Sequence, residues 1–197
     1  KQFQEAGITL LTGKASFTGP QGIKVKNAEG ETEYSFSKCI VATGSVPASF
    51  PSLKPDGQTV LSAASVLNLK EAPESLIIVG AGAIGIEMGE LFHRLGTKII
   101  LVEGLPRILP AEDTEVSELL HAYFSKEGWS IHTGKRIASV STVDGLSKLV
   151  FESGEELTAA KTLVAVGRRA NTAGLELEAA GISVKPNGCI ETDEYLR

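Results

Sequence analysis

The sequence predicts a three-layer α/β fold built from a parallel sheet, helices and an antiparallel β-meander. Two continuous apolar runs, 76–79 and 99–102, are typical of strands buried on both faces of a parallel sheet. Between them, apolar residues recur at helical spacing from Ile84 to Leu95, and Gly96 stands where a helix would end. Strand, helix and strand within about 30 residues form a βαβ unit.

The segments on either side of this unit read as β-rich. Short runs at 8–11, 22–25 and 33–36, with turn residues between them, predict a three-stranded antiparallel meander. Residues 39–42 continue as an apolar run that we expect to be buried. Three prolines between positions 46 and 56 mark a connector, so we place a domain boundary there.

The remainder of the chain predicts one further helix and several short strands. A helix follows Asp113, with Val116, Leu119, Leu120, Tyr123 and Phe124 on one face, and Gly128 ends it. After position 166 we expect a loop, a short helix at 175–180 and short strands at 182–184 and 189–191. Strand-like runs before that point cover 129–133, 137–142, 148–151 and 162–166. The predicted segments are therefore 1–46, 47–166 and 167–197.

Composition sets limits on the class of protein. Hydrophobic content of 42% and charged content of 22% are ordinary for a globular chain of 197 residues. A net charge of −5 argues against a nucleic-acid partner, and no apolar run of about 18 residues predicts a membrane span. Cys39 and Cys189 stand 150 positions apart, so we expect two buried thiols in a reducing cytoplasm. The chain begins without Met and suggests a piece of a longer protein.

The glycine motif Gly80-Ala81-Gly82-Ala83-Ile84-Gly85 follows the first buried strand and opens the helix. Gly80 permits a tight turn, Gly82 lets the backbone approach a pyrophosphate, and Gly85 lets the helix pack on the sheet. The helix N-terminus offers unpaired amides to that anion. Glu103, 18 positions after Gly85, ends the next strand and would accept hydrogen bonds from ribose hydroxyls. This pattern predicts a Rossmann-like NAD-binding domain.

Coenzyme choice depends on the residues around Glu103. Its charge would repel a 2′-phosphate, which favours NAD over NADP. Arg107 could bind such a phosphate, but with Glu103 in the ribose position we interpret it as a loop ion pair or a local anchor. The alternative explanation of the whole motif is purely structural: a glycine-rich turn, with Glu103 as a surface glutamate.

Four stretches in this order and spacing resemble the pyridine nucleotide–disulfide oxidoreductases, the family of dihydrolipoamide dehydrogenase. They are Val41-Ala42-Thr43-Gly44-Ser45, the stretch from Ile78 to Gly89, Arg107-Ile108-Leu109-Pro110, and Val166 to Thr172. The resemblance covers essentially the whole chain. It implies a parent enzyme with an FAD domain, an inserted NAD domain and a dimerisation domain, in which 1–46 and 167–197 are parts of the FAD domain.

The resemblance also implies roles for single residues. Thr43, Gly44 and Ser45 would lie near the ADP moiety of FAD, and Ala15 would meet the FAD adenine. Glu87 and Gly167 match positions at the nicotinamide end of NAD, and Ile137 matches a position beside the NAD adenine. Simpler explanations stay open, because Thr43-Gly44 can be a tight turn, Glu87 can stabilise a helix N-terminus, and Ile137 can be a core residue.

The activity that the resemblance implies passes electrons from a dithiol through a disulfide and FAD to NAD⁺. We expect the redox disulfide and the acid/base histidine to lie outside these 197 residues, so the chain itself would bind NAD and catalyse nothing. The resemblance implies a homodimeric parent and leaves open its membership of a 2-oxoacid dehydrogenase complex. Two alternatives remain: a related flavoenzyme without the disulfide, such as a transhydrogenase or NADH oxidase, and a stand-alone NAD-binding module.

Overall fold

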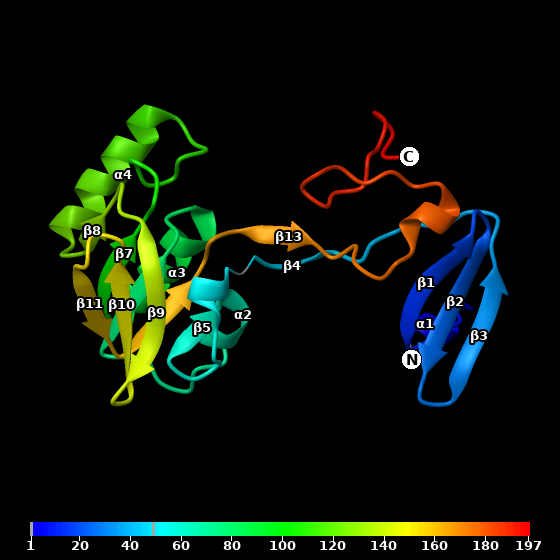
Figure 1. The fold of residues 1–197 in the computed structure, drawn as a ribbon, viewed down its shortest axis with the longest axis horizontal. Coiled ribbons are helices and arrows are strands. Elements are labelled where there is room, and N and C mark those ends of the chain that lie inside the picture. The colour runs from blue at the N-terminus through cyan, green and yellow to red at the C-terminus, as the bar shows by residue number, and fades with distance from the viewer. Residues whose placement is uncertain (1, 49) are drawn as a thin grey trace. The chain divides into compact units, whose positions relative to one another are not determined.

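The computed structural model describes residues 2–48 and 50–197, so Lys1 and Ser49, the latter inside the predicted connector, lie outside the described residues. The chain divides into two compact units (Figure 1). Unit 1 joins Lys1–Val46 to Arg169–Arg197, and unit 2 is Pro47–Arg168. The two chain crossings between them, β4 (Ser45–Pro47) and β13 (Arg168–Ala170), pair as a two-stranded sheet.

Unit 2 is built on a five-stranded parallel sheet. Its strand order is β5-β12-β6-β7-β8, with every neighbouring pair parallel. The central strand β6 is the first buried run that the sequence predicts, and β7 is the second. The bounds are Val60–Ser62 for β5, Lys161–Val164 for β12, Ser75–Val79 for β6, Lys98–Val102 for β7 and Ser130–His132 for β8.

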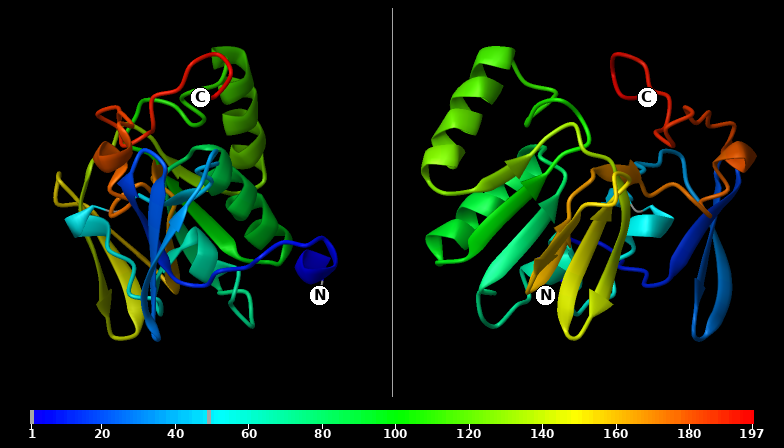
Figure 2. Two further views of the ribbon diagram at one scale, coloured as in Figure 1. Left: turned by 90° about the vertical axis from the view of Figure 1, so that its right-hand side faces the viewer. Right: turned by 60° about the vertical axis from the view of Figure 1, so that its left-hand side comes forward.

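Side chains of β6 alternate between two hydrophobic clusters, and this alternation explains the three layers. Leu76 and Ile78 pack with the helical layer, whereas Ile77 and Val79 pack against an antiparallel sheet, and all four are at most 2% exposed. The helical layer holds α2 (Ala63–Val66), α3 (Ala83–Arg94) and α4 (Thr114–Lys126). The meander sheet holds β9 (Ile137–Val143), β10 (Leu146–Phe151) and β11 (Glu156–Ala159) (Figure 2). The predicted α/β class is confirmed.

The two longest helices end where the sequence predicts. Helices α3 and α4 are followed by Gly96 and Gly128, both at a φ of +90°, which a side chain would disfavour. The predicted apolar face of α4 is partly wrong. Phe124 is buried and Leu120 packs against the core, but Val116, Leu119 and Tyr123 are exposed. The buried face centres on Ser117, whose hydroxyl donates to the carbonyl of Ile108 at 2.6 Å.

Unit 1 contains a three-stranded meander where the sequence predicts one between residues 8 and 36, but its first strand differs from the predicted one. Its strands β1 (Lys14–Gly19), β2 (Gly22–Asn27) and β3 (Gly30–Ser35) pair antiparallel in that order. Residues 8–11 form no strand, because β2 pairs instead with β1, the segment that follows them in the chain. Residues 182–184 and 189–191 form only one bridge, between Val184 and Ile190. The short elements are α1 (Gln2–Glu5), η1 (Pro51–Leu53, in unit 2) and η2 (Leu177–Ala180), a 3₁₀ helix where a helix was predicted.

Two expectations of burial in unit 1 are wrong. In the run 39–42, Cys39, Ile40 and Ala42 are exposed, Ile40 to 91%, and only Val41 is half-buried. Cys39 and Cys189 are both exposed and unpaired, where we expected buried thiols. Apolar composition indicates a preference for burial, but burial also needs a packing partner, and the described part of unit 1 supplies none at these positions.

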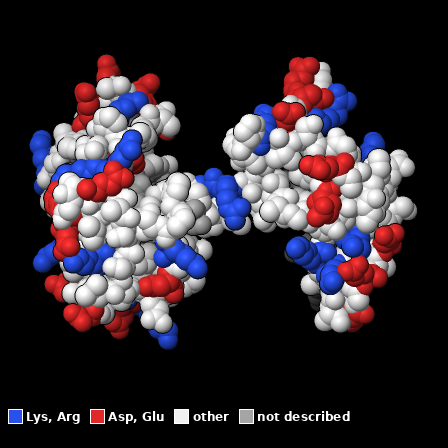
Figure 3. Space-filling view, viewed as in Figure 1, with Lys and Arg blue, Asp and Glu red and all other residues white. Residues whose placement is uncertain are grey.

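Charge and hydropathy match this architecture. Acidic and basic side chains are interspersed on the face of each unit that Figure 3 shows. Among the described residues, no helix is long and apolar enough to cross a membrane.

Asp56 organises the loop that leads into β5. Its carboxylate accepts hydrogen bonds from the amides of Gln58, Thr59 and Val60 at 2.7 to 2.9 Å and from the hydroxyls of Thr59 and Thr142 at 2.9 Å. Partial burial alone would raise the pKa of Asp56, but these donors outweigh it and hold the pKa well below its ordinary value. The network ties the β5 edge to β9 of the meander sheet.

We expect Asp56→Asn to destabilise unit 2 by about 1 kcal/mol at pH 7, a modest cost because the residue is exposed. Since the folded-state pKa is lowered, the wild-type advantage is present at neutral pH and disappears as pH falls below about 4. Urea unfolding followed by the fluorescence of Trp129, the single tryptophan, measures both effects. An advantage that persisted unchanged at pH 2 would contradict this account.

Candidate functional site

Two of the three motif glycines are required by the fold. Gly80 has a φ of +100°, and a Cβ there would lie 2.5 Å from the carbonyl oxygen of Ala165. A Cβ on Gly85 would lie 1.9 Å from the carbonyl oxygen of Gly80. Both distances are far below van der Waals contact, so only glycine allows the turn from β6 and the packing of α3 upon it.

Gly82 differs because nothing in the fold requires it. Its backbone is extended, with φ −75° and ψ −177°, and a Cβ there would meet no atom within 4 Å. It is the N-cap of α3 without a side-chain cap, and the first bond of the helix runs from the amide of Ile86 to the carbonyl of Gly82 at 3.1 Å. The amides of the first turn therefore have no partner within the helix.

Glu103 follows β7 beside this helix N-terminus. Its Oε2 accepts a hydrogen bond from the amide of Ala81 at 2.8 Å, and its Oε1 accepts one from the amide of Leu105 at 2.9 Å. The carboxylate therefore connects the glycine loop to the end of the neighbouring strand. Each oxygen keeps a further lone pair for a ligand.

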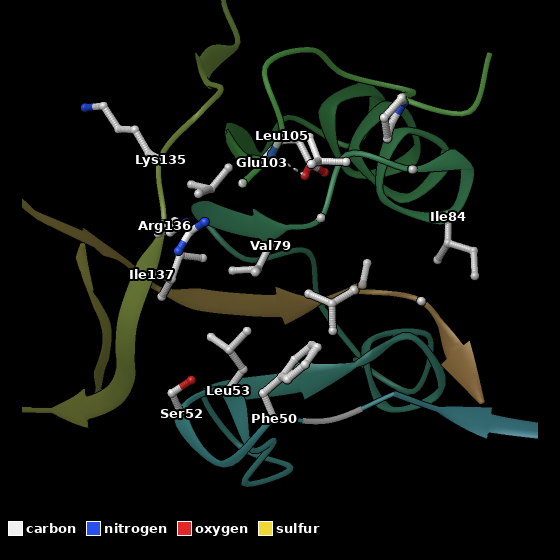
Figure 4. A pocket seen from close by; sticks show the side chains of 18 of the residues that line it. Phe50, Ser52, Leu53, Val79, Ile84, Glu103, Leu105, Lys135, Arg136 and Ile137 are labelled. Carbon is white, nitrogen blue, oxygen red and sulfur yellow. Dashed lines mark hydrogen bonds between the residues drawn. The ribbon is translucent and has the colours of Figure 1, made fainter. Parts of the chain in front are cut away.

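These features border one large pocket of about 950 Å³ at the carboxyl ends of the parallel strands (Figure 4). The loop and the start of α3 contribute Gly80, Gly82, Ala83 and Ile84. Glu103, Ile137 and Gly167, which are far apart in the sequence, also line it. Pockets of this size at this edge of an α/β sheet are typical of nucleotide sites.

The remaining predicted site residues do not line this pocket. Ala81 is fully buried and Gly85 is buried against Gly80, so both act through the backbone of the loop. Glu87 is exposed on α3. Four predicted positions belong to unit 1: Ala15 in β1, exposed Thr43 and Gly44, and Ser45 at the start of β4.

The Thr43-Gly44 turn is held by Asn171. The Asn171 amide donates to the Gly44 carbonyl at 3.0 Å, and its side chain donates to the Thr43 carbonyl at 3.2 Å. Gly44 has a φ of +69°, which explains its identity by turn geometry alone.

Sequence reasoning missed two basic residues of the pocket, Lys135 and Arg136. Lys135 forms an ion pair with Glu155, whose pKa this hydrogen bond lowers. Arg136 points toward the pocket, and Figure 4 shows Lys135 extending away. The adjacent basic pair directly before a predicted strand was the available indication. Phe50 and Ser52, from the predicted connector, also line the pocket.

Arg107 does anchor its own loop, as predicted. Its guanidinium donates to the carbonyl of Pro110 at 2.9 Å and to the hydroxyl of Thr114 at 3.0 Å. These bonds orient it toward the start of α4.

The comparisons with known proteins agree with this geometry. The sequence profile of the pyridine nucleotide-disulphide oxidoreductase family matches residues 1–197. A dihydrolipoyl dehydrogenase of Chlorobaculum tepidum is 40% identical over 98% of this chain and 42% of its own length. One of Thermus scotoductus is 41% identical over 96% of this chain and 41% of its own length. The chain thus spans less than half the length of these curated relatives.

Solved structures show the same fold. The crystal structure of LpdA from Mycobacterium tuberculosis has a TM-score of 0.89 and 28% identity, covering 98% of this chain and 43% of that one. A NAD-dependent persulfide reductase from A. fulgidus has a TM-score of 0.82 and 26% identity, covering 99% of this chain and 38% of that one.

The two kinds of glycine predict losses of stability of different size for the same substitution. We expect Gly85→Ala to destabilise unit 2 by about 1–3 kcal/mol, because the added methyl overlaps the Gly80 carbonyl. Gly82→Ala should cost less, about 0.5 kcal/mol, because the added methyl meets no atom and only the N-cap preference of glycine over alanine is lost. Urea unfolding of both variants checks this, and equal losses would show that Gly82 is also a packing residue.

Proposed function

Because the chain belongs to the pyridine nucleotide-disulphide oxidoreductase family, we propose that the pocket of unit 2 binds the pyridine nucleotide and that this nucleotide is NAD(H). Gly82 is the observation that carries the proposal. The fold leaves open space beside it, and a ligand that must approach the backbone closely is a physical reason for a glycine there beyond its role as N-cap. A pyrophosphate in that space would accept hydrogen bonds from the first amides of α3.

The preference for NAD rests on Glu103. With the pyrophosphate at α3, the adenosine ribose extends toward the end of β7, where Glu103 offers its free lone pairs to the 2′- and 3′-hydroxyls. The same negative charge opposes a 2′-phosphate. Ile137 would then border the adenine, and Gly167 and Glu87 would belong to the nicotinamide end. Among these positions, Ile137 and Gly167 line the pocket.

We assign unit 1 to the FAD side of the parent enzyme. Ala15 and the Thr43-Gly44-Ser45 turn are the positions that we propose to face the adenine and ADP parts of FAD. The parent would pass electrons from a dithiol through a disulfide and FAD to NAD⁺, as a homodimer. Two exposed, unpaired cysteines suit the reducing cytoplasm in which we place it. Membership of a 2-oxoacid dehydrogenase complex stays a proposal.

What the chain's own residues contribute to that reaction is binding and orientation. The amides of α3 would hold the pyrophosphate and Glu103 the ribose, which fixes the direction in which the dinucleotide runs along the pocket. FAD, when bound, would relay the electrons from the dithiol–disulfide pair to the nicotinamide. Productive transfer depends on such positioning, because the reacting rings must be held in contact.

Isothermal titration of the 197-residue chain tests the binding proposal. We expect NADH to bind and Gly82→Val to weaken its binding about tenfold or more. The valine side chain would occupy the space in which the pyrophosphate accepts hydrogen bonds from the first amides of α3. Gly19→Ala is the matched control, because that glycine also has open space around it but lies in unit 1. No NADH binding by the wild type, or equal binding by Gly82→Val, would refute the assignment.

We also expect the 197-residue chain to oxidise no NADH with lipoamide as acceptor. Its two cysteines are 150 positions apart and form no CxxxxC motif, so it offers no redox disulfide between the coenzyme and a dithiol. Absorbance at 340 nm measures turnover, with a complete dihydrolipoyl dehydrogenase as the positive control. Yellow flavin absorbance together with lipoamide reduction would contradict the proposal.

A further inference from the structure

A buried serine on α4 holds the loop that contacts the glycine turn. Ser117 is 1% exposed, and its hydroxyl donates to the carbonyl of Ile108 at 2.6 Å, away from the residues that line the pocket. The next residue of the loop, Leu109, has a φ of +45°, a left-handed conformation that residues with a side chain disfavour. Because such a conformation persists only where surrounding contacts fix it, this stretch of the loop has one defined geometry.

The peptide group before Leu109 connects Ser117 to the glycine turn. The carbonyl of that peptide group accepts from Ser117, and its amide donates to the carbonyl of Ala81 at 2.8 Å. Ala81 is thereby bound at both of its main-chain groups, since its own amide donates to Glu103 at 2.8 Å. The next peptide group, which links Ala81 to Gly82, is therefore fixed in its orientation.

The fixed peptide group sets the direction of the Gly82 amide. The carbonyl and the N–H of a trans peptide point in opposite directions, and no cis peptide occurs among the described residues. Because the carbonyl of Ala81 faces Leu109, the amide of Gly82 faces away from that loop. Within residues 2–48 and 50–197 this amide has no acceptor, and Gly82 lines the pocket whereas Leu109 does not. The Gly82 amide is thus a donor that is oriented but not used by the protein.

On the basis of the proposed nucleotide function of the pocket, we propose that Ser117 is a positioning residue of the diphosphate site and acts through two peptide groups. The hydroxyl of Ser117, the peptide group before Leu109 and the peptide group before Gly82 form a series in which each member donates to the next. We call this series the Ser117 network, and an oxygen of the diphosphate is its last acceptor. Hydrogen bonds in such a series polarise one another, so Ser117 both orients the Gly82 amide and strengthens it as a donor.

NMR titrations of the full 197-residue chain test this with ADP and with adenosine, which lacks the diphosphate. We expect Ser117→Ala to weaken ADP binding about threefold or more and to leave adenosine binding unchanged. Ser147→Ala is the matched control, because Ser147 is also fully buried in unit 2 and its hydroxyl bonds that of Thr162 at 2.7 Å, outside the Ser117 network. It should lower stability without changing the affinity for ADP. The fluorescence of Trp129 confirms that both variants fold.

A second measurement needs no substitution. In the wild type, ADP should move the amide proton of Leu109 downfield and slow its exchange, although Leu109 does not line the pocket. The reason is that a diphosphate bound to the Gly82 amide polarises the whole Ser117 network. Adenosine should leave the Leu109 signal in place. This measurement decides the question even if Ser117→Ala does not fold.

Three results would overturn the role of Ser117 and leave the nucleotide function intact. The first is a Ser117→Ala variant that binds ADP as tightly as the wild type. The second is an equal loss of ADP affinity in Ser147→Ala, or an equal loss of adenosine affinity in Ser117→Ala, since either would indicate a general effect of packing. The third is ADP binding that does not move the Leu109 signal. If the wild type binds neither ADP nor NADH, both this inference and the proposed function are refuted.

Discussion

The turn between β6 and α3 is the constraint on which the pocket depends. The backbone of Gly80 passes so close to Ala165, at the end of β12, that no Cβ fits, and Gly85 then packs directly on the Gly80 carbonyl. These two contacts place the N-terminus of a twelve-residue helix at the carboxyl edge of the parallel sheet. Free amides, a favourable helix dipole and an open crevice then coincide at one place.

The other layers complete the site because β6 is buried on both faces. Ile77 and Val79 hold the meander sheet, which brings Arg136 and Ile137 to the pocket, while Leu76 and Ile78 hold α3 in position. Glu103 links two of these parts, since it ends β7 and accepts the Ala81 amide. The pocket is thus a product of all three layers, and each wall comes from a different part of the chain.

The sequence predicted the features that depend on local pattern. Buried strands, helix ends at Gly96 and Gly128, and the glycine turn all follow from short-range periodicity and backbone freedom. The failures have one cause, which is tertiary context. Most of the apolar run 39–42 and the residues Val116, Leu119 and Tyr123 are exposed, because no apolar layer of the described structure covers them. Arg136 was missed because its position depends on how the meander sheet folds against β6.

Glu103 shows a second limit of prediction from a motif, which concerns the contacts of a residue and not its position. The motif predicts a carboxylate at the end of β7 that faces a ribose, and the structure does place it on the pocket. Spacing alone could not show that the same carboxylate accepts two main-chain amides, because that depends on the loop geometry around Ala81 and Leu105. A residue that sequence reasoning treats as a ligand contact is also part of the scaffold.

The central claim is that the first amides of α3 bind a diphosphate, and hydrogen exchange at residues 82–86 tests it most directly. We expect NADH to slow exchange of these amides strongly, and an equimolar mixture of adenosine and nicotinamide riboside, which lacks the diphosphate, to leave it unchanged. Unaltered exchange at saturating NADH, or equal protection by the nucleosides, would contradict the account.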